Sequence, residues 1–474
     1  EYGIGSMGAP ARKFVDFLKK AGQTYWQMLP ICPTSYGDSP YQSFSTFAGN
    51  PYFIDLDTLA EKGWLTKEAC EASDYGDNES YIDYGRIYNS RFVLLKQAFL
   101  NSDILSDEKF TEFCKANQHW LPDYALYMAL KNQNDGKSWI EWEEEIRLRK
   151  PEAVEYYKKE LEEECNFYEF LQYEFHEQWT KVKEYAHEKG IQIVGDVPIY
   201  VAFDSADTWA NPELFQLDEK NLPLGVAGCP PDAFSATGQL WGNPLYDWEY
   251  HKKTGYDWWI LRIGYSYRLY DIVRVDHFRG FEAYFSIPYG DETAVNGHWE
   301  KGPDFELFAA MKMKLGKKEM IAEDLGVITP PVRKMIKKCG YPGMKVLQFA
   351  FDSYDSEYLP HNYDKNCIVY TGTHDNQTTR GWYEENNRKV QKYIREYLRV
   401  KSGKDVVEAM IATAMSSTAG TAVIPMQDWL GLGREARMNF PSTLGDNWKW
   451  RLTDGQLTDA LAAHMKDVTE TYCR

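Results

Sequence analysis

Short runs of apolar residues recur along the chain, separated by longer stretches of helical periodicity or of turn-forming residues. The runs of strand length cover residues 25–31, 193–201, 272–278, 320–326, 346–351, 367–373 and 421–426. Because these runs are continuously apolar rather than alternating, they are typical of strands that are covered on both faces. The alternation of such strands with helices predicts an α/β fold with a parallel sheet.

The number of predicted strands indicates a barrel. Seven runs are one short of the eight strands of a (β/α)8 TIM barrel. Helical patterns between the runs, such as residues 331–339 after Thr329 and residues 405–416, suit the outer ring of helices. We therefore predict that residues 1–474 form a single decorated barrel, whose first strand either lies before Glu1 or is too degenerate to recognise.

Two stretches between predicted strands are too long to be simple crossovers. Residues 55–190 are rich in helix formers, with many Glu and Lys, and predict an inserted, mainly helical subdomain whose charged faces are solvated. Residues 202–265 form a second insertion. Its central part, residues 218–248, is rich in Gly, Pro and Asn and has little periodicity. Loops of this length inside a compact domain are usually lids or binding loops, so we expect this one to cover the active site.

Composition and charge exclude several classes of protein. The 474 residues include 53 Lys and Arg against 71 Asp and Glu, a formal net charge of −18. This surplus repels phosphate backbones and anionic membranes, and no Lys/Arg block is present, so we expect neither nucleic acid nor membrane as a partner. No apolar run approaches the roughly 18 residues that cross a bilayer. Eight cysteines without a CxxC pair, and no recognisable signal peptide, predict a cytoplasmic protein with reduced thiols.

Aromatic residues are unusually frequent, at 15% of the chain, with 34 Tyr, 23 Phe and 16 Trp. Many of them can be buried in a large hydrophobic core. The remainder can line a binding groove, where flat rings suit stacking on the apolar faces of sugars.

Three acidic residues stand at the carboxyl ends of predicted strands: Asp276, Glu323 and Asp375. A carboxylate that ends an apolar strand is costly to bury unless it meets a ligand or a partner. Any one of them could be a helix cap. In a parallel barrel, however, the carboxyl ends of all strands face one opening, so we expect the three acids to share one cavity.

Two acids in unlike environments suit the cleavage of a glycosidic bond, because one attacks as a carboxylate while the other donates a proton. Arg274 precedes Asp276 by two residues and therefore lies on the same strand face. Its guanidinium favours the ionised form of Asp276, although a purely structural ion pair is the alternative for Arg274. His277 points to the opposite face, which predicts a packing role.

Sequence motifs in a fixed order carry a family resemblance. They are SPYQSFSTFAGNP at residues 39–51, GDVPIYVAFDSADTW at 195–209, GCPPDAFSATGQLWGNPLYDW at 228–248, RVDHFRGF at 274–281, IAEDLG at 321–326, YTGTHDNQTTRGW at 370–382 and RMNFPST at 437–443. This set resembles the 4-α-glucanotransferases, also called amylomaltases or disproportionating enzymes, of glycoside hydrolase family 77. The resemblance covers nearly the whole chain. One departure is that the family pattern has a strand of the form G-[IV]-L-x-P before the position of residues 2–5, where this chain begins.

The resemblance implies a role for each matched residue. Asp276 would be the nucleophile, Glu323 the general acid/base, and Asp375 the acid that binds and distorts the sugar at the cleavage point. The matched substrate-binding residues are Arg274, His374, Asp232, Trp241, Tyr41 and Phe349. Of these, Asp232 and Trp241 belong to the loop that overhangs the donor sites, and Phe349, the weakest match, is expected near an acceptor site.

The implied reaction is a retaining double displacement that moves segments of α-1,4-glucan to the 4-hydroxyl of another glucan or of glucose, with no metal or cofactor. Retention predicts carboxyl groups of Asp276 and Glu323 about 5–5.5 Å apart. An α-1,4-glucan hydrolase of the amylase clan is the alternative, since it shares the covalent intermediate. A barrel that only binds glucan is disfavoured because all three acids are present. We expect a monomer or a weak homodimer.

Overall fold

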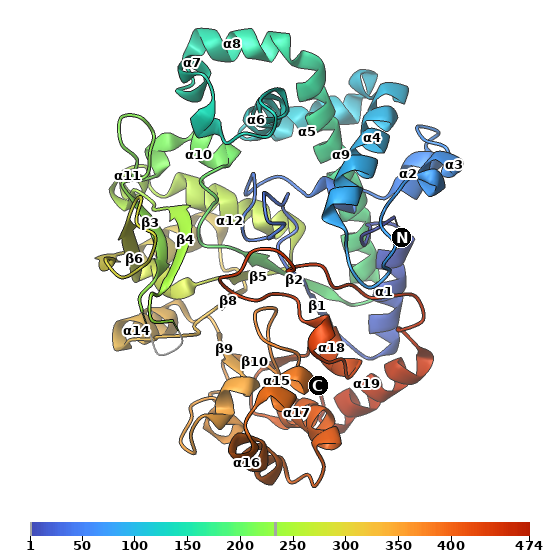
Figure 1. Cartoon of the computed structure of the whole chain (residues 1–474), viewed down its shortest axis with the longest axis vertical. Helices are drawn as coiled ribbons and strands as arrows, with labels where there is room; N and C mark the ends of the chain where they lie inside the picture. The colour runs from blue at the N-terminus through green and yellow to red at the C-terminus, as the bar shows by residue number, and fades with distance from the viewer. Residues whose placement is uncertain (1, 232–234) are drawn as a thin grey trace.

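A computed structural model describes residues 2–231 and 235–474 of the chain (Figure 1). Asp232, predicted to overhang the donor sites, lies outside these described residues. No described helix is both long enough and apolar enough to span a membrane.

Parallel strands form the centre of the molecule. One sheet has the order β1 (Tyr25–Gln27), β2 (Gln192–Val197), β5 (Ile272–Val275) and β8 (Met320–Ala322), and a second has the order β9 (Gly343–Val346), β10 (Cys367–Tyr370) and β11 (Thr421–Val423). The two sheets meet where the Ala322 N–H donates to the Pro342 carbonyl oxygen at 2.9 Å. Within the described residues, a parallel strand therefore lies at six of the seven predicted runs, and the seventh strand, β9, precedes its run.

The barrel is open on the side where β1 faces β11. No ladder joins these two strands in the described part of the chain. A cavity of about 590 Å³ lies between them and extends inward to Asp196 and Arg274. Both strands therefore present an edge without a neighbouring strand.

One predicted strand is wrong in position. Residues 346–351 were expected to be extended, but β9 ends at Val346 and Leu347–Phe351 forms the 3-10 helix η6. The register explains the end of the strand, because Val346 pairs with Tyr370, the last residue of β10. Leu347 and Phe351 are buried in a separate apolar cluster, so the apolar run reflects burial rather than an extended backbone.

The barrel interior accounts for the continuous apolar runs. Its buried side chains come from five strands and are Val194, Ile272, Ile321, Met344, Ile368 and Tyr370. Neighbouring residues such as Val273 and Ala322 belong instead to the main core cluster. The strands β2, β5, β8 and β10 are therefore covered on both faces, as predicted, whereas β1 and β11 are half-buried.

The described chain between β1 and β2 consists mainly of helices. They are α2 (Leu56–Glu61), α3 (Lys67–Ala72), α4 (Tyr84–Asn101), α5 (Glu108–Ala116), α6 (Leu121–Gln133), α7 (Glu144–Arg147), α8 (Pro151–Glu160) and α9 (Glu162–Glu188). Figure 1 shows α4 to α9 gathered on one side of the barrel. The long helix α9 packs along α6, and its buried Glu174 pairs with Lys62 at 2.6 Å.

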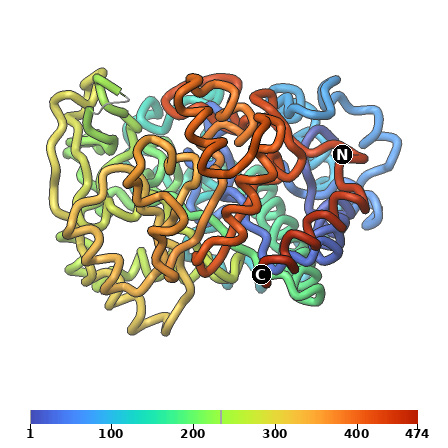
Figure 2. Tube along the Cα trace, turned by 90° about the horizontal axis from the view of Figure 1, so that it is seen from below, coloured from blue at the N-terminus to red at the C-terminus, as the bar shows by residue number. Residues whose placement is uncertain are grey.

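The remaining helices surround the strands. They are α1 (Ala9–Lys20), α10 (Ala206–Ala210), α11 (Trp248–Lys253), α12 (Asp257–Leu269), α13 (Phe305–Leu315), α14 (Pro330–Cys339), α15 (Thr379–Glu385), α16 (Arg388–Leu398), α17 (Val406–Ser416), α18 (Met426–Trp429) and α19 (Asp459–Thr471). The predicted helix after Thr329 is α14, which begins with Pro330 and ends before Gly340, where φ is +77°. The other predicted helix is α17. Near the chain ends α1 contacts α19 (Figure 2).

An antiparallel sheet lies beside the barrel. Its order is β4 (Gln239–Pro244), β3 (Gly225–Cys229), β6 (Ala283–Pro288) and β7 (His298–Lys301). Residues 218–248, expected to be a loop, therefore contain two strands, and β6 and β7 were not predicted. Glycines in β3 interrupt the run of apolar residues that would identify it as a strand in the sequence. A Cβ on Gly228 would stand 2.1 Å from the carbonyl oxygen of Gln239, so close pairing requires glycine.

Candidate active site

Asp276 and Glu323 stand next to each other at the carboxyl ends of neighbouring strands. The Asp276 N–H donates to the Val197 carbonyl oxygen at 3.0 Å, which attaches it to the end of β2. The Glu323 N–H donates to the Val275 carbonyl oxygen at 3.1 Å, which attaches it to the end of β5. The two acids thus leave adjacent strands at the same edge, as parallel topology requires.

The Glu323 side chain is buried and held by two backbone groups. Its Oε2 accepts from the His277 N–H and its Oε1 from the Leu325 N–H, each at 2.7 Å. Burial, together with the nearby charge of Asp276, raises the pKa of Glu323 to about 8, against the opposing effect of Arg274 and the two hydrogen bonds. Glu323 is therefore mainly protonated at neutral pH, the form that a general acid needs.

Asp276 has a different environment. Burial raises its pKa to about 6, while Arg274, whose Nη1 lies 3.2 Å from Asp276 Oδ1, lowers it. The negative charges of Asp196 and Asp375 also raise the pKa of Asp276. Asp276 is thus ionised at neutral pH while its neighbour Glu323 is not, and unlike protonation of two adjacent carboxyl groups is the requirement for retaining glycosidic cleavage.

Asp196 is a site residue that the sequence reasoning missed. It stands on β2, and Arg274 Nη1 donates to both of its carboxylate oxygens, at 2.8 and 2.6 Å. Both side chains are buried. Arg274 therefore binds Asp196 more closely than Asp276, so the structural ion pair exists in addition to the contact with Asp276. The sequence offered one sign of this role, an acidic residue inside the apolar run 193–201.

Aromatic rings form one wall of the site. The ring of Tyr41 stacks on that of His374, with centroids 5.0 Å apart, and both lie 5.8 Å from the buried ring of Trp448. The Tyr41 hydroxyl donates to Asp196 Oδ2 at 2.8 Å. The structure thus brings Tyr41 and His374 together beside the Arg274 pair. Trp448 was not predicted and belongs to a segment with no recognised motif.

Asp375 follows β10 and is half exposed. Its Oδ1 accepts from the Asn439 side-chain amide at 2.7 Å and lies 3.4 Å from His374 Nε2. Its backbone carbonyl accepts from Arg437 at 3.0 Å. The motif at residues 437–443 therefore orients Asp375.

Comparisons with known proteins agree with this geometry. The family model described as 4-alpha-glucanotransferase matches residues 1–458. The chain belongs to the 4-α-glucanotransferase family. It is 52% identical over 477 residues to a 4-alpha-glucanotransferase of Clostridium butyricum, covering 100% of this chain and 98% of that protein. It is 46% identical over 481 residues to that of Thermus thermophilus, covering 99% and 95%.

A solved structure of this family supports the fold directly. The amylomaltase from Streptococcus agalactiae in complex with acarbose superposes with a TM-score of 0.97 at 41% identity, covering 100% of this chain and 96% of that one. The predicted family and the barrel-type α/β fold are therefore confirmed. Since the curated relatives are named 4-alpha-glucanotransferases, the prediction of transfer is favoured over the hydrolase alternative.

Two further residues matched to the family motifs, Trp241 and Phe349, make aromatic ring contacts. Trp241, on β4, meets the ring of His277 edge to face at 4.8 Å. His277 is neutral, because burial lowers its pKa to about 3, and its ring packs as predicted. Phe349 contacts the ring of Tyr358 at 5.5 Å.

Proposed function

We propose that Asp276 is the nucleophile and Glu323 the general acid/base of a 4-α-glucanotransferase reaction on α-1,4-glucans. The observation that supports this assignment most strongly is that the two carboxyl groups differ in protonation at neutral pH although they lie at the carboxyl ends of adjacent strands. Burial and the charge of Asp276 keep Glu323 protonated, whereas Arg274 favours the carboxylate of Asp276.

In the first step, Asp276 attacks the anomeric carbon of the donor glucan while Glu323 gives its proton to the glycosidic oxygen. The C–O bond to the leaving chain breaks, that chain departs with a new hydroxyl, and a glycosyl ester forms on Asp276. Glu323 is left ionised. Because the negative charge on Asp276 disappears when the ester forms, the pKa of Glu323 falls at the moment when it has to act as a base.

In the second step, Glu323 takes the proton of the 4-hydroxyl of an acceptor glucan or glucose. The acceptor oxygen then attacks the anomeric carbon from the side that the leaving chain left, and the ester bond to Asp276 breaks. Two inversions give overall retention, the α-1,4 bond is restored, and both carboxyl groups return to their first protonation states.

Asp375 and the aromatic wall would hold the sugar at the cleavage point. The half-exposed carboxylate of Asp375 suits hydrogen bonds to ring hydroxyls that tighten as the sugar flattens, which stabilises the transition state more than the ground state. The stacked rings of Tyr41 and His374, together with the tilted ring of Trp448, give an aromatic surface next to it. Donor chains would run beneath the segment that carries Trp241, and acceptors would lie toward Phe349.

Incubation with maltotriose as the only substrate tests the proposal. Transfer gives a ladder of longer and shorter oligosaccharides together with glucose, because each excised unit is attached to another chain. Breakdown to shorter products alone would identify a hydrolase instead. Thin-layer or anion-exchange chromatography distinguishes the two patterns, and Asp276→Asn serves as the inactive control.

The biological setting is part of the proposal. Acarbose, bound by the Streptococcus agalactiae relative, supports malto-oligosaccharides as the ligands of this chain. Seven of the eight cysteines, namely Cys32, Cys70, Cys114, Cys165, Cys339, Cys367 and Cys473, are free thiols, which supports a reducing, cytoplasmic location. We infer a monomer or weak homodimer that requires neither nucleic acid nor membrane.

A further inference from the structure

The carboxyl group of Asp428 joins the two ends of the loop 371–379, which carries Asp375. Thr371 directly follows the last residue of β10, and its hydroxyl donates to Asp428 Oδ2 at 2.6 Å. Thr379 is the first residue of α15. Its N–H donates to Asp428 Oδ1 at 2.8 Å, and its hydroxyl donates to Asp428 Oδ2 at 2.7 Å. One side chain from a different element thus holds together the base of the loop that presents Asp375.

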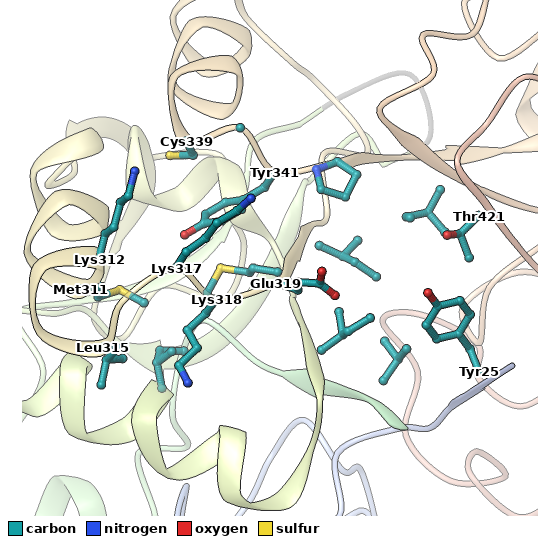
Figure 3. A pocket seen from close by; sticks show the side chains of 18 of the residues that line it. Tyr25, Met311, Lys312, Leu315, Lys317, Lys318, Glu319, Cys339, Tyr341 and Thr421 are labelled. Atoms are coloured by element: carbon teal, nitrogen blue, oxygen red, sulfur yellow. The ribbon is translucent and has the colours of Figure 1, made fainter. Parts of the chain in front are cut away.

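Asp428 lies on α18, at the same end of the barrel as the proposed active site. The preceding strand β11 begins with Thr421, which lines the amino-terminal end of the barrel together with Tyr25, the first residue of β1 (Figure 3). The helix α18 follows the other end of β11, and the contacts of Asp428 go to the segment that follows β10. Because β10 pairs with β11, these contacts are directed away from the open side between β1 and β11.

The side chain of Asp428 is buried, and so are Thr371 and Thr379. Burial raises the pKa of Asp428, whereas the hydrogen bonds from the two threonines lower it. A carboxylate only accepts hydrogen bonds, so it satisfies all three donors at once, whereas an asparagine would bring two N–H donors of its own. The chain therefore keeps a costly buried acid at the point where donors from both ends of one loop meet.

Capping of α15 does not explain this arrangement. The Thr378 hydroxyl accepts from the Gly381 N–H at 3.2 Å and already caps the helix. In addition, Thr371 belongs to the other end of the loop, where no helix begins. The contacts of Asp428 therefore fit a role in fixing the loop as a whole.

The loop is also hydrogen-bonded internally. The Asn376 side-chain oxygen accepts from the Thr373 N–H at 2.9 Å and from its hydroxyl at 2.8 Å. The Asp375 N–H donates to the same hydroxyl at 3.3 Å. From another side, the Gln348 amide donates to the Gln377 carbonyl oxygen at 2.9 Å. A displacement of the loop ends would therefore move Asp375 instead of being absorbed within the loop.

We propose that Asp428 is a positioning residue of the transfer reaction, which holds Asp375 in place against the sugar at the cleavage point. Asp428 is itself buried and acts through the loop 371–379. The inference rests on the proposed function, in which Asp375 binds the transition state. Because a misplacement of about 1 Å can cost roughly 100-fold in rate, a fixed loop base suits a group whose hydrogen bonds tighten in the transition state.

Maltotriose kinetics of Asp428→Ala test the proposal. We expect kcat to fall roughly 10–100-fold while KM stays within about twofold of wild type, because an interaction made mainly in the transition state is weakened. Asp428→Asn keeps an acceptor for the Thr379 N–H and should retain more activity than Asp428→Ala. Thr371→Val removes one donor and keeps the carboxyl group. It should show a smaller loss of kcat, and it serves as the test if Asp428→Ala does not fold.

A double-mutant cycle shows whether Asp428 acts through Asp375. The probe is acarbose, whose unsaturated ring resembles the flattened sugar of the transition state, and calorimetry gives its Kd. Asp375→Asn should weaken acarbose roughly tenfold, and Asp428→Ala roughly threefold to tenfold. The double variant should bind no more than about twofold more weakly than Asp375→Asn, because the loop then has no carboxylate left to place. Independent contributions would multiply instead.

Glu174→Ala is the matched control, since Glu174 is also a buried acid but lies on α9 and pairs with Lys62 at 2.6 Å. It should lower the denaturation midpoint and leave both kcat and the Kd of acarbose at wild-type values. If Asp428→Ala behaved like this control, or if the two effects on acarbose multiplied, the inference would be overturned while the role of Asp375 stood. Wild-type turnover in Asp375→Asn alone would instead overturn the proposed role of Asp375, and this inference with it.

Discussion

The backbone N–H of His277 donates a 2.7 Å hydrogen bond to Glu323 Oε2. His277 directly follows Asp276 and makes this bond from the left-handed region, with φ at +50°. A residue attached to the proposed nucleophile therefore fixes the side chain of the proposed acid. Because residues other than glycine rarely adopt this conformation, the backbone strain at His277 is tied to the geometry of the pair.

Substitutions at His277 should separate its backbone role from its ring. Asn tolerates positive φ, whereas a β-branched Val does not. We expect His277→Val to lose more stability than His277→Asn, by roughly 1–2 kcal/mol, and to have the lower kcat. Loss of the hydrogen bond in the Val variant should also raise the pKa of Glu323 and move the alkaline limb of kcat/KM upward. Thermal unfolding and pH–rate profiles of the two variants would check this, and equal behaviour would contradict it.

The pH dependence of the wild-type enzyme follows from the same two acids. The reaction needs Asp276 ionised, which is lost as the pH falls through about 6, and Glu323 protonated, which is lost as the pH rises through about 8. We therefore expect a bell-shaped profile of kcat/KM with its maximum between these values. Maltotriose disproportionation measured from pH 4 to pH 10 gives the test. A rate that stays constant through pH 9 would show that the protonated acid is not Glu323.

Glu323→Gln should lower turnover of maltotriose by roughly 10²–10⁴-fold, because the leaving sugar then departs without a proton. A maltosyl fluoride donor needs no such proton, so its first step should be largely restored in this variant. Asp276→Asn is the matched comparison, and it should turn over neither maltotriose nor the fluoride donor, because it lacks the nucleophile. Burst kinetics of fluoride release would measure the difference. If fluoride and maltotriose were equally slow in Glu323→Gln, the role of acid would belong to another residue.

Continuous apolar runs identified the barrel strands because those strands are buried on both faces. The positions of Asp276 and Glu323 followed from the same logic, since parallel strands place their carboxyl ends together. Where an apolar run was buried without being extended, as in η6 (Leu347–Phe351), the pattern misplaced the strand. Whether such a run is extended or only buried depends on where the partner strand β10 ends. The sequence of the run itself does not contain this information.

Other features depended on contacts between distant segments. The glycines of β3 concealed an antiparallel strand, because their role is close approach rather than apolar patterning. Trp448 reaches the aromatic wall from a segment far from Tyr41 in the chain. Asp196 was visible as an acid within an apolar run, but its pairing with Arg274 required the register of β2 and β5.

That register supports the last prediction, which concerns Asp196. In Asp196→Asn, the buried guanidinium of Arg274 would lose its closer charged partner, and such a loss typically costs about 3–5 kcal/mol. The negative charge of Asp196 raises the pKa of Asp276, so its removal should lower that pKa and shift the acid limb of kcat/KM to lower pH. Stability and the pH profile should therefore change together.

Tyr41→Phe is the matched control for Asp196→Asn. It removes the 2.8 Å hydrogen bond to Asp196 and the longer, 3.5 Å contact with His374 Nδ1, and it keeps both the ion pair and the stacked ring. We expect a loss of stability of roughly 1 kcal/mol and an acid limb near its wild-type position. Chemical denaturation and maltotriose kinetics on both variants would check this. If Asp196→Asn left the acid limb in place, the electrostatic coupling between β2 and Asp276 would be refuted, because a purely structural role for Asp196 changes stability without moving the pKa of the nucleophile.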